Sequence, residues 1–225
     1  MQNYKFIYLL GPEGVGKTTT ANHLRCYIAK KKKGAIITEV RSTHLYSYII
    51  WSLLIRLGRV EYYNYPDGTR IPRIDRWYLR RIIRPWLLIE FTSIIISIFF
   101  KVFLPSLLGC VVICTRYVID SAVNLLAYTL VAPRGLPLIY RVILPTLLRL
   151  IPKGGLLIYL DANYEKLVCR YRERGSYTEP LNWIDFYRRL TRKMVSSLPN
   201  HKAIFITTDS MSRRDVLKAI LKEMI

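Results

Sequence analysis

Residues 7–20, IYLLGPEGVGKTTT, constrain the fold of this chain more than any other stretch. An apolar run ends at Leu10, and a GxxxxGKT motif follows at residues 11–18, which is the spacing of a phosphate-binding loop between a buried strand and a helix. The glycines let the backbone curl so that its N–H groups point inward, and the helix N-terminus adds partial positive charge beneath the phosphates. The stretch therefore predicts a P-loop that holds a nucleoside triphosphate.

The same loop assigns chemical roles to its side chains. Lys17 is expected to bridge the β- and γ-phosphates, and Thr18 is expected to offer its hydroxyl to Mg²⁺ as the predicted metal ligand. Glu13 is unusual, because a carboxylate inside an anion cradle is unfavourable unless it faces an acceptor hydroxyl or a neighbouring arginine; the alternative is a solvated loop charge. With ATP and Mg²⁺ as the predicted ligands, the predicted nucleotide-binding residues are Gly11, Gly14, Val15, Gly16, Lys17, Thr18 and Thr19.

Charge and cysteine usage bound the partners and the compartment. The 225 residues, 52% of them hydrophobic, fit one α/β domain over 1–225. The net charge of +20, from 35 Lys and Arg against 15 Asp and Glu, indicates acidic partners: nucleotides, nucleic acid or an anionic membrane surface. No aromatic-rich RNA-binding signature or Cys/His finger is present, so nucleic acid is not favoured. Four dispersed cysteines without zinc-site spacing, and an N-terminus unlike a signal peptide, predict reduced thiols and a cytoplasmic location.

Apolar runs alternate with helical patterns along the whole chain. This order predicts a three-layer P-loop NTPase fold of the α/β class, with a five-stranded parallel sheet, helices on both faces and ligands at the carboxyl ends of the strands. A long loop is predicted over 58–75, where two prolines and two glycines fall. The predicted strands lie near 7–10, 35–40, 110–117, 154–163 and 202–209.

The apolar segment 84–109 resembles a membrane span at first sight. Glu90 and Lys101 leave only ten uncharged residues between them, and Pro105 follows, which is short of the ~20 residues that a span needs. A buried helix packed against the sheet is the favoured interpretation. Contact with a membrane surface or with another subunit is the alternative. The two interpretations are compatible if one face of the helix packs on the sheet while the other joins a dimer.

Four stretches in order carry a family resemblance: the P-loop with its acidic residue, PSLLGCVVICTRYVIDS, GLLIYLDANYEKLVCRYRERG and DFYRRLTRKM. Together they look like the thymidylate kinase family of nucleoside monophosphate kinases, in its divergent thymidylate-kinase-like branch. The resemblance runs from the first strand to the last helix and is weak over 39–100. It implies an acceptor region at about 39–135, an arginine-rich lid at about 170–181 and a homodimer built through apolar helices.

The resemblance also implies roles for individual residues. Glu13 would face the acceptor sugar, and Arg116 would match the arginine of the family's Asp-Arg-Tyr element, which holds the acceptor phosphate. Arg170, Arg172 and Arg174 would lie in or beside the lid that closes over the transferring phosphoryl group. The predicted catalytic residues are Lys17, Arg116, Arg170, Arg174 and Glu13.

Other interpretations of these side chains stay open. Arg116 could close its strand by pairing with Asp120. The lid arginines, together with Arg188, Arg189 and Arg192, could form a solvated basic face.

The chain departs from the family pattern at the acceptor side. Thr115 stands where the family has an aspartate before Arg116, so Mg²⁺ would be held by Thr18, waters and phosphates, with Glu39 or Asp120 as outer partners. TEVRST replaces the usual Thr-Arg-Glu-Pro after the second strand, and 87–98 has no arginine to cover the acceptor base. These changes affect acceptor recognition and leave the nucleotide loop intact.

The leading functional hypothesis is a kinase of nucleotide biosynthesis that transfers the γ-phosphate of ATP·Mg²⁺ to a nucleoside monophosphate, with dTMP giving dTDP as the first choice. A kinase of another small acceptor is the nearest alternative. An ATP-binding switch or ATPase at a membrane or partner surface would use Asp161 as the carboxylate on the metal. An inactive kinase fold is the remaining alternative, and peripheral membrane contact is considered but not favoured.

Overall fold

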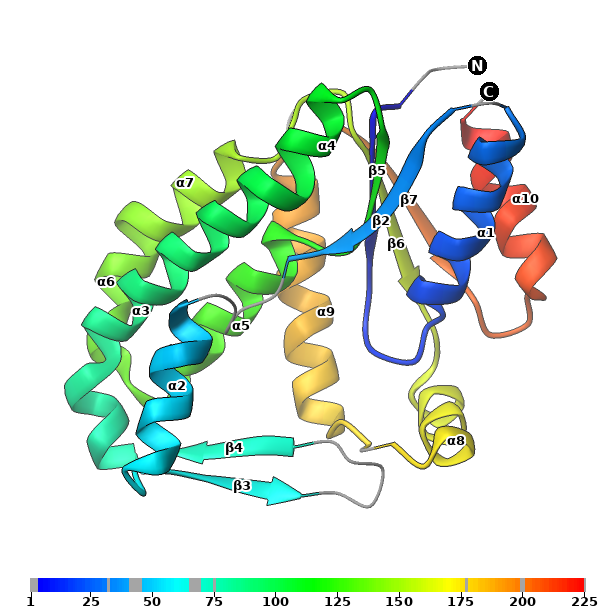
Figure 1. Cartoon of the computed structure of the whole chain (residues 1–225). Helices are drawn as coiled ribbons and strands as arrows, with labels where there is room; N and C mark the ends of the chain where they lie inside the picture. Colours follow the sequence, from blue (N-terminus) through cyan, green and yellow to red (C-terminus); the bar gives the residue numbers. More distant parts are fainter. Residues whose placement is uncertain are drawn as a thin grey trace.

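The computed structural model describes residues 4–31, 33–40, 46–64, 70–74, 76–176, 178–198 and 201–224. Its centre is a five-stranded parallel sheet in the order β2-β5-β1-β6-β7 (Figure 1). This sheet confirms the predicted fold class. The strands are β1 (Phe6–Leu10), β2 (Ala35–Glu39), β5 (Val111–Arg116), β6 (Leu156–Asp161) and β7 (Lys202–Thr207).

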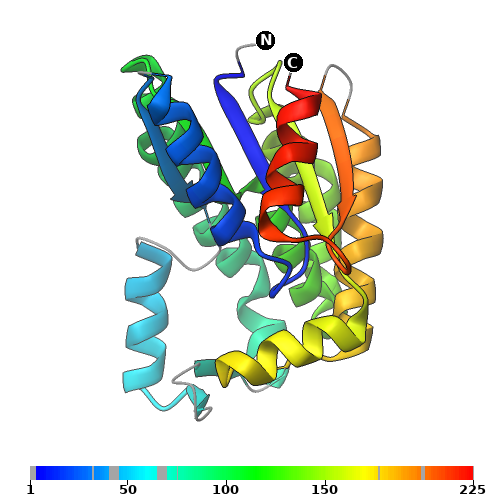
Figure 2. The ribbon, with the colours of Figure 1, turned by 90° about the vertical axis from the view of Figure 1, so that its right-hand side faces the viewer.

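Helices cover both faces of this sheet (Figures 1 and 2). One face carries α1 (Lys17–Lys30) and α10 (Arg213–Glu223). The helix α8 (Tyr164–Arg174) lies beyond the carboxyl ends of the strands, and α2 (Tyr46–Arg56) packs on α3. The other face carries α3 (Arg76–Ile98), α5 (Val118–Val131), α9 (Leu181–Ser196) and a broken helix made of η2 (Pro133–Gly135), α6 (Leu136–Leu138), η3 (Ile139–Ile143) and α7 (Leu144–Arg149).

The central strands are buried on both faces, which explains their continuous apolar sequences. Tyr8 and Leu10 of β1 face the core formed with α3, α5 and α9, whereas Ile7 and Leu9 face the core formed with α1 and α10. All four side chains are fully buried. This alternation fixes the register of β1, so the chain leaves its carboxyl end directly into the P-loop.

The prediction of a long loop over 58–75 is wrong for most of its length. The structure has a two-stranded antiparallel hairpin there, β3 (Val60–Asn64) and β4 (Arg70–Ile74); residues 65–69 and 75 lie outside the described part. Proline normally argues against a strand, but Pro72 lies in a sheet of only two strands. Each strand there has an open edge, where a missing N–H is tolerated.

The apolar segment 84–109 belongs to one long helix. The helix α3 continues through the π-helical turn η1 (Phe99–Phe103) into α4 (Leu104–Leu107). Pro105 has no N–H to donate within this continuous helix, and the α-helical hydrogen-bond pattern is already interrupted just before it by η1. Within the described residues, 80–107 is the one helix long and apolar enough to cross a membrane, with 39% of its most apolar window buried. Its inner face packs in the core through Leu87, Ile94 and Ile98, as expected of a sheet-packed helix.

The last helix, α10, begins with a reciprocal side-chain cap. The Ser212 hydroxyl accepts a hydrogen bond from the Asp215 N–H at 3.2 Å, and the Asp215 carboxylate accepts one from the Ser212 N–H at 3.3 Å. This reciprocal arrangement satisfies two N–H groups that a helix start would otherwise leave unpaired. Asp209, three residues before Ser212, accepts a hydrogen bond from the Asn163 N–H at 2.7 Å.

Candidate active site

The loop between β1 and α1 has the backbone geometry of a phosphate cradle. Gly11, Gly14 and Gly16 have φ angles of 132°, 79° and 100°, a region that side-chain-bearing residues rarely adopt. A Cβ on Gly11 would lie 2.0 Å from the backbone oxygen of Leu160 in β6. The strand beside the loop therefore requires glycine at this position.

Lys17 begins α1 with its ammonium group inside the loop. Its Nζ donates hydrogen bonds to the backbone oxygens of Gly11 at 2.6 Å and Pro12 at 2.8 Å, and lies 3.9 Å from Glu13 Oε2. The side chain is buried, whereas Thr18 in the next position is exposed. This arrangement presents one cation and one hydroxyl at the same helix N-terminus, as phosphate and Mg²⁺ binding would need.

Arg116, at the carboxyl end of β5, forms an ion pair with Glu13 of the P-loop. The alternative in which Arg116 pairs with Asp120 is therefore wrong. Glu13 is 40% exposed and Arg116 is 16% exposed, so the pair lies at the mouth of the loop. The loop carboxylate thus faces a neighbouring arginine, which is one of the two orientations expected for it.

Asp120 instead belongs to a buried hydrogen-bond chain that anchors the P-loop. The Tyr187 hydroxyl of α9 donates to Asp120 Oδ1 at 2.6 Å and accepts from the Gly11 N–H at 3.3 Å, while Asp120 Oδ2 accepts from the Tyr117 N–H at 3.0 Å. Burial raises the pKa of the Tyr187 phenol well above its usual value, and the negative charge of Asp120 raises this pKa further. The phenol therefore keeps its proton and acts as a hydrogen-bond donor. Sequence reasoning missed Tyr187 because it is 176 residues from Gly11 in the chain.

Replacing Tyr187 with phenylalanine should lower the stability of the protein by about 1–3 kcal/mol, because it leaves the Asp120 carboxylate and the Gly11 N–H without their buried partner. For a chain of this size the melting temperature should fall by roughly 2–4 °C per kcal/mol. The KM for ATP should rise, since the first residue of the P-loop loses its anchor. Tyr140→Phe, at an exposed tyrosine of η3, is the matched control. Unchanged denaturant unfolding and ATP binding in Tyr187→Phe would rule out the anchoring role.

The helix α8 is tied to the P-loop by two side chains. Arg170 donates from Nη1 to the Gly14 oxygen at 3.2 Å and from Nη2 to the Thr208 oxygen at 3.1 Å. The Tyr171 hydroxyl contacts the Glu13 oxygen at 3.1 Å. Arg170 is therefore held between the loop and the start of the β7–α10 connection, whereas Arg172 and Arg174, further along α8, are exposed.

The predicted site residues line two adjoining cavities. The smaller, of about 70 Å³, joins the P-loop to the carboxyl ends of β2 and β5; the larger, of about 370 Å³, joins it to α8 and the start of α10. Gly11, buried at the end of β1, lines neither. The smaller cavity is lined by Glu13, Gly14, Gly16, Lys17, Thr18, Thr19, Glu39, Thr115, Arg116 and Arg174. Of the other predicted residues, Val15 and Arg170 line the larger.

The residues around the smaller cavity fit a Mg²⁺ ion that also binds phosphate. Thr18 and Glu39 both line it and offer the oxygen ligands that Mg²⁺ prefers. Asp120 is occupied by Tyr117 and Tyr187, so it does not serve as an outer partner of the metal. Among the described residues, no group of three or more His, Cys, Asp or Glu could hold a metal ion by itself. Phosphate oxygens and water would have to complete the shell.

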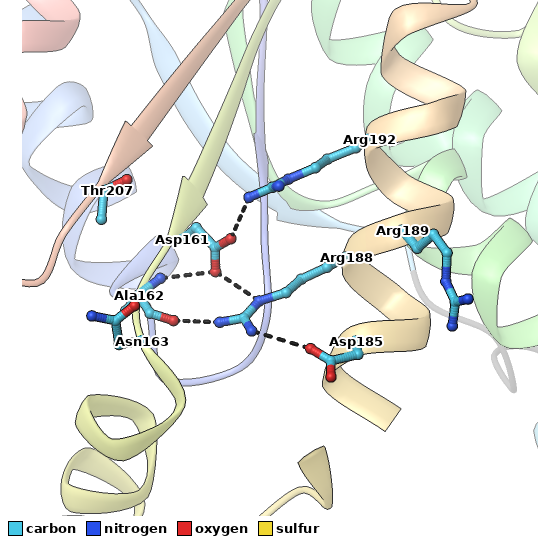
Figure 3. A pocket seen from close by; sticks show the side chains of 8 residues that line it. All are labelled: Asp161, Ala162, Asn163, Asp185, Arg188, Arg189, Arg192 and Thr207. Carbon is cyan, nitrogen blue, oxygen red and sulfur yellow. Dashed lines mark hydrogen bonds and ion pairs between the residues drawn. The ribbon is translucent and has the colours of Figure 1, made fainter. Parts of the chain in front are cut away.

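Asp161 at the end of β6 is fully engaged by α9 (Figure 3). Its Oδ1 accepts from Arg188 Nε at 3.0 Å and its Oδ2 accepts from Arg192 Nη2 at 2.9 Å. These contacts face a separate cavity of about 610 Å³ beside α9. Asp161 lines neither of the two cavities at the P-loop. The hypothesis of Asp161 as the metal carboxylate is therefore not supported. The alternative of a solvated basic face is wrong for Arg188, which is mostly buried and paired with Asp161. Arg192 also pairs with Asp161 but stays exposed, and Arg189 points away from Asp161 (Figure 3).

Comparison with known proteins places this geometry in a structural class. No protein-family model and no curated protein sequence matches the chain. Thymidylate kinase from Ehrlichia chaffeensis is 17% identical over 100% of this chain and 99% of that one, with a TM-score of 0.50. Thymidylate kinase from Candida albicans is 12% identical over 98% and 91%, with a TM-score of 0.58. Deoxyadenosine kinase from M. mycoides with bound dATP is 10% identical over 97% and 98%, with a TM-score of 0.55.

The chain therefore has the fold of the P-loop nucleoside and nucleotide kinases over its whole length. Within that class it is similar in structure to both thymidylate and deoxyadenosine kinases, so the resemblance noted in the sequence is confirmed at the level of the fold. Identities of 10–17% show the fold alone and leave the acceptor undetermined.

Proposed function

We propose that this protein transfers the γ-phosphate of ATP·Mg²⁺ to a nucleoside monophosphate, with dTMP as the first candidate. The observation that carries the proposal is Arg116, held by Glu13 at the mouth of the P-loop cleft. An acceptor that bears its own phosphate needs a cation beside the P-loop in addition to Lys17, and Arg116 would supply it.

The other side chains of the cleft have complementary roles in this reaction. An oxygen of the acceptor phosphate attacks the γ-phosphorus, and the bond from that phosphorus to the β–γ bridging oxygen breaks. Catalysis then depends on cations around the equatorial oxygens and on exclusion of water rather than on a strong base. Lys17 would bind the β- and γ-phosphates, and Arg174 of α8, which lines both cavities, would add a further cation. Bound Mg²⁺ would neutralise developing charge on the phosphates.

The choice of acceptor rests on charge rather than on overall similarity. One of the similar structures is a deoxyadenosine kinase, whose named acceptor is a nucleoside without a phosphate. A nucleoside would leave Arg116 without an anionic partner other than Glu13. We therefore favour a monophosphate, and we favour dTMP within that class because of the sequence motifs shared with thymidylate kinases. A different phosphorylated acceptor is the second candidate, because Thr115 and the 87–98 segment depart from the family pattern.

An ADP-release assay with ATP·Mg²⁺ tests the proposal directly. The acceptors should include dTMP, dAMP, thymidine, deoxyadenosine and a phosphorylated sugar, with a reaction that lacks acceptor as the control. Turnover that depends on a monophosphate, and is greatest with dTMP, is the expected result. Turnover with deoxyadenosine alone would replace the proposal by a nucleoside kinase. ADP release that is independent of acceptor would indicate an ATPase, and no release at all would indicate an inactive fold.

A further inference from the structure

The long helix made of α3, η1 and α4 is apolar on the side that faces away from the core. Its exposed side chains include Leu107 and Leu108, which are 78% and 75% exposed, and Phe100, which is 59% exposed. We call this row the apolar ridge; its members are Leu88, Ile96, Phe99, Phe100, Leu104, Leu107 and Leu108. Large apolar residues gathered on one exposed face usually mark an interaction site.

The ridge follows from the helical periodicity of the segment. Phe100, Leu104, Leu107 and Leu108 are spaced four, three and one residues apart, which puts them on one side of a helix. The opposite side is buried, with Ile98 and Val102 in the core. An ordinary surface helix would have polar residues where the ridge lies, so this helix has apolar groups on two opposing faces.

Charge around the ridge is of one sign. Between residues 76 and 153 the sequence has only two acidic residues, Glu90 and Asp120, and both are buried. This segment of the chain therefore exposes no carboxylate side chain. The same segment exposes the cations Arg80, Arg81, Arg84, Arg134, Arg141, Arg149 and Lys153.

The tip of the ridge adds further cations from other turns. Leu107 and Leu108 precede β5, and the turn that precedes β2 lies beside them, since the Val111 N–H donates to the Gly34 oxygen at 2.8 Å. That turn exposes Lys31 and Lys33. These turns lie at the amino ends of the parallel strands, at the top of Figure 1, whereas the P-loop lies at the opposite edge. A partner bound at this tip would leave the P-loop cleft open.

We propose that the apolar ridge docks the protein on an anionic lipid bilayer. A peripheral membrane site combines exposed aromatic and leucine side chains with cations, and anionic headgroups complement a segment, 76–153, that exposes cations and no carboxylate. A second copy of the chain fits less well. In a symmetric dimer the same surface meets itself, which would set arginine against arginine around the apolar contact. This inference is independent of the identity of the acceptor.

Co-sedimentation with vesicles tests the proposal with the full chain. We expect binding to vesicles of phosphatidylcholine with about one third phosphatidylglycerol, weaker binding to phosphatidylcholine alone, and a decline with added salt. The double variant Leu107→Glu, Leu108→Glu should reduce binding to the anionic vesicles at least about tenfold, because it replaces the two most exposed leucines of the ridge by charge. Both side chains are exposed, so the variant should keep the wild-type circular dichroism and melting temperature.

A second double variant with the same change in net charge tests whether the ridge or the overall charge of the protein drives vesicle binding. Lys218→Gln with Lys222→Gln removes two positive charges from α10, on the other face of the sheet, and should retain most of the vesicle binding. If both double variants lost vesicle binding to the same extent, the interaction would be non-specific charge attraction and the proposal would be overturned. Failure of the wild-type protein to bind both kinds of vesicle would overturn it as well. A dimer without vesicles that dissociates in the Leu107→Glu, Leu108→Glu variant would instead assign the ridge to a second copy.

Discussion

Replacing Lys17 with alanine is expected to abolish phosphoryl transfer, with a fall in kcat of about 10³-fold or more. The ammonium group lies inside the curl of the P-loop, within hydrogen-bond distance of two loop oxygens. It is therefore already positioned where the β- and γ-phosphates would lie. Among the described residues no other lysine lines the two cavities of the site, so none of them can replace it.

The same substitution should leave the fold cooperative. The Lys17 bonds to the Gly11 and Pro12 oxygens lie within the loop, and loss of each costs about 1–3 kcal/mol at most. ADP release measures the catalytic effect, and denaturant unfolding measures the structural one. Lys30→Ala, at an exposed lysine in the last turn of the same helix, is the control. Retained turnover in Lys17→Ala would disprove the P-loop assignment; if Lys17→Ala unfolds, Lys17→Met preserves the apolar stem and repeats the test.

The parallel sheet and the P-loop were predictable because their signals are local. Each buried strand is a short apolar run, and the loop has a fixed spacing of glycines, lysine and threonine that only one backbone path satisfies. Gly11 illustrates this, since the Leu160 oxygen leaves no room for a side chain. Helix starts behave in the same way: the reciprocal Ser212–Asp215 cap spans three residues and can be read from the sequence.

Contacts between distant segments could not be predicted in the same way. The bond from the Gly11 N–H to Tyr187 and the pairing of Asp161 with Arg188 join residues 176 and 27 positions apart. Nothing in the sequence distinguishes Tyr187 or Arg188 from their neighbours on the same amphipathic helix. The hairpin over 60–74 was missed for a different reason, because its prolines and glycines indicate turns and do not reveal that a two-stranded sheet tolerates Pro72.

The apolar ridge lies between these two cases. The scarcity of acidic residues over 76–153 is visible in the sequence, because the segment has only two carboxylates. Which leucines face outward is not visible, since the helix is apolar on both faces and the sequence does not reveal which face packs in the core. Composition therefore indicated an anionic partner, and the fold is needed to locate the surface.

Replacing Arg116 with alanine is expected to lower kcat/KM for the acceptor by about 10²–10³-fold while the KM for ATP changes by less than about threefold. Arg116 reaches the P-loop cleft from the end of β5 and contacts Glu13, whereas the larger cavity beside α8 and α10 does not include it. A nucleoside triphosphate has Lys17 and the loop N–H groups for its phosphates. The acceptor phosphate would have Arg116.

Two further variants identify which property of Arg116 matters. Glu13→Gln breaks the ion pair but keeps the cation, so it should impair acceptor use less than Arg116→Ala; since Glu13 is 40% exposed, water solvates the released groups and stability should change little. Arg189→Ala removes an exposed arginine of α9 that points away from Asp161, and it should leave the KM values of both substrates unchanged (Figure 3).

Equal effects of Arg116→Ala on the KM for ATP and on the use of the acceptor would mean that Arg116 orders the P-loop through Glu13. In that case the acceptor phosphate must be held by another cation of the cleft, and Arg174 is the one that lines both cavities.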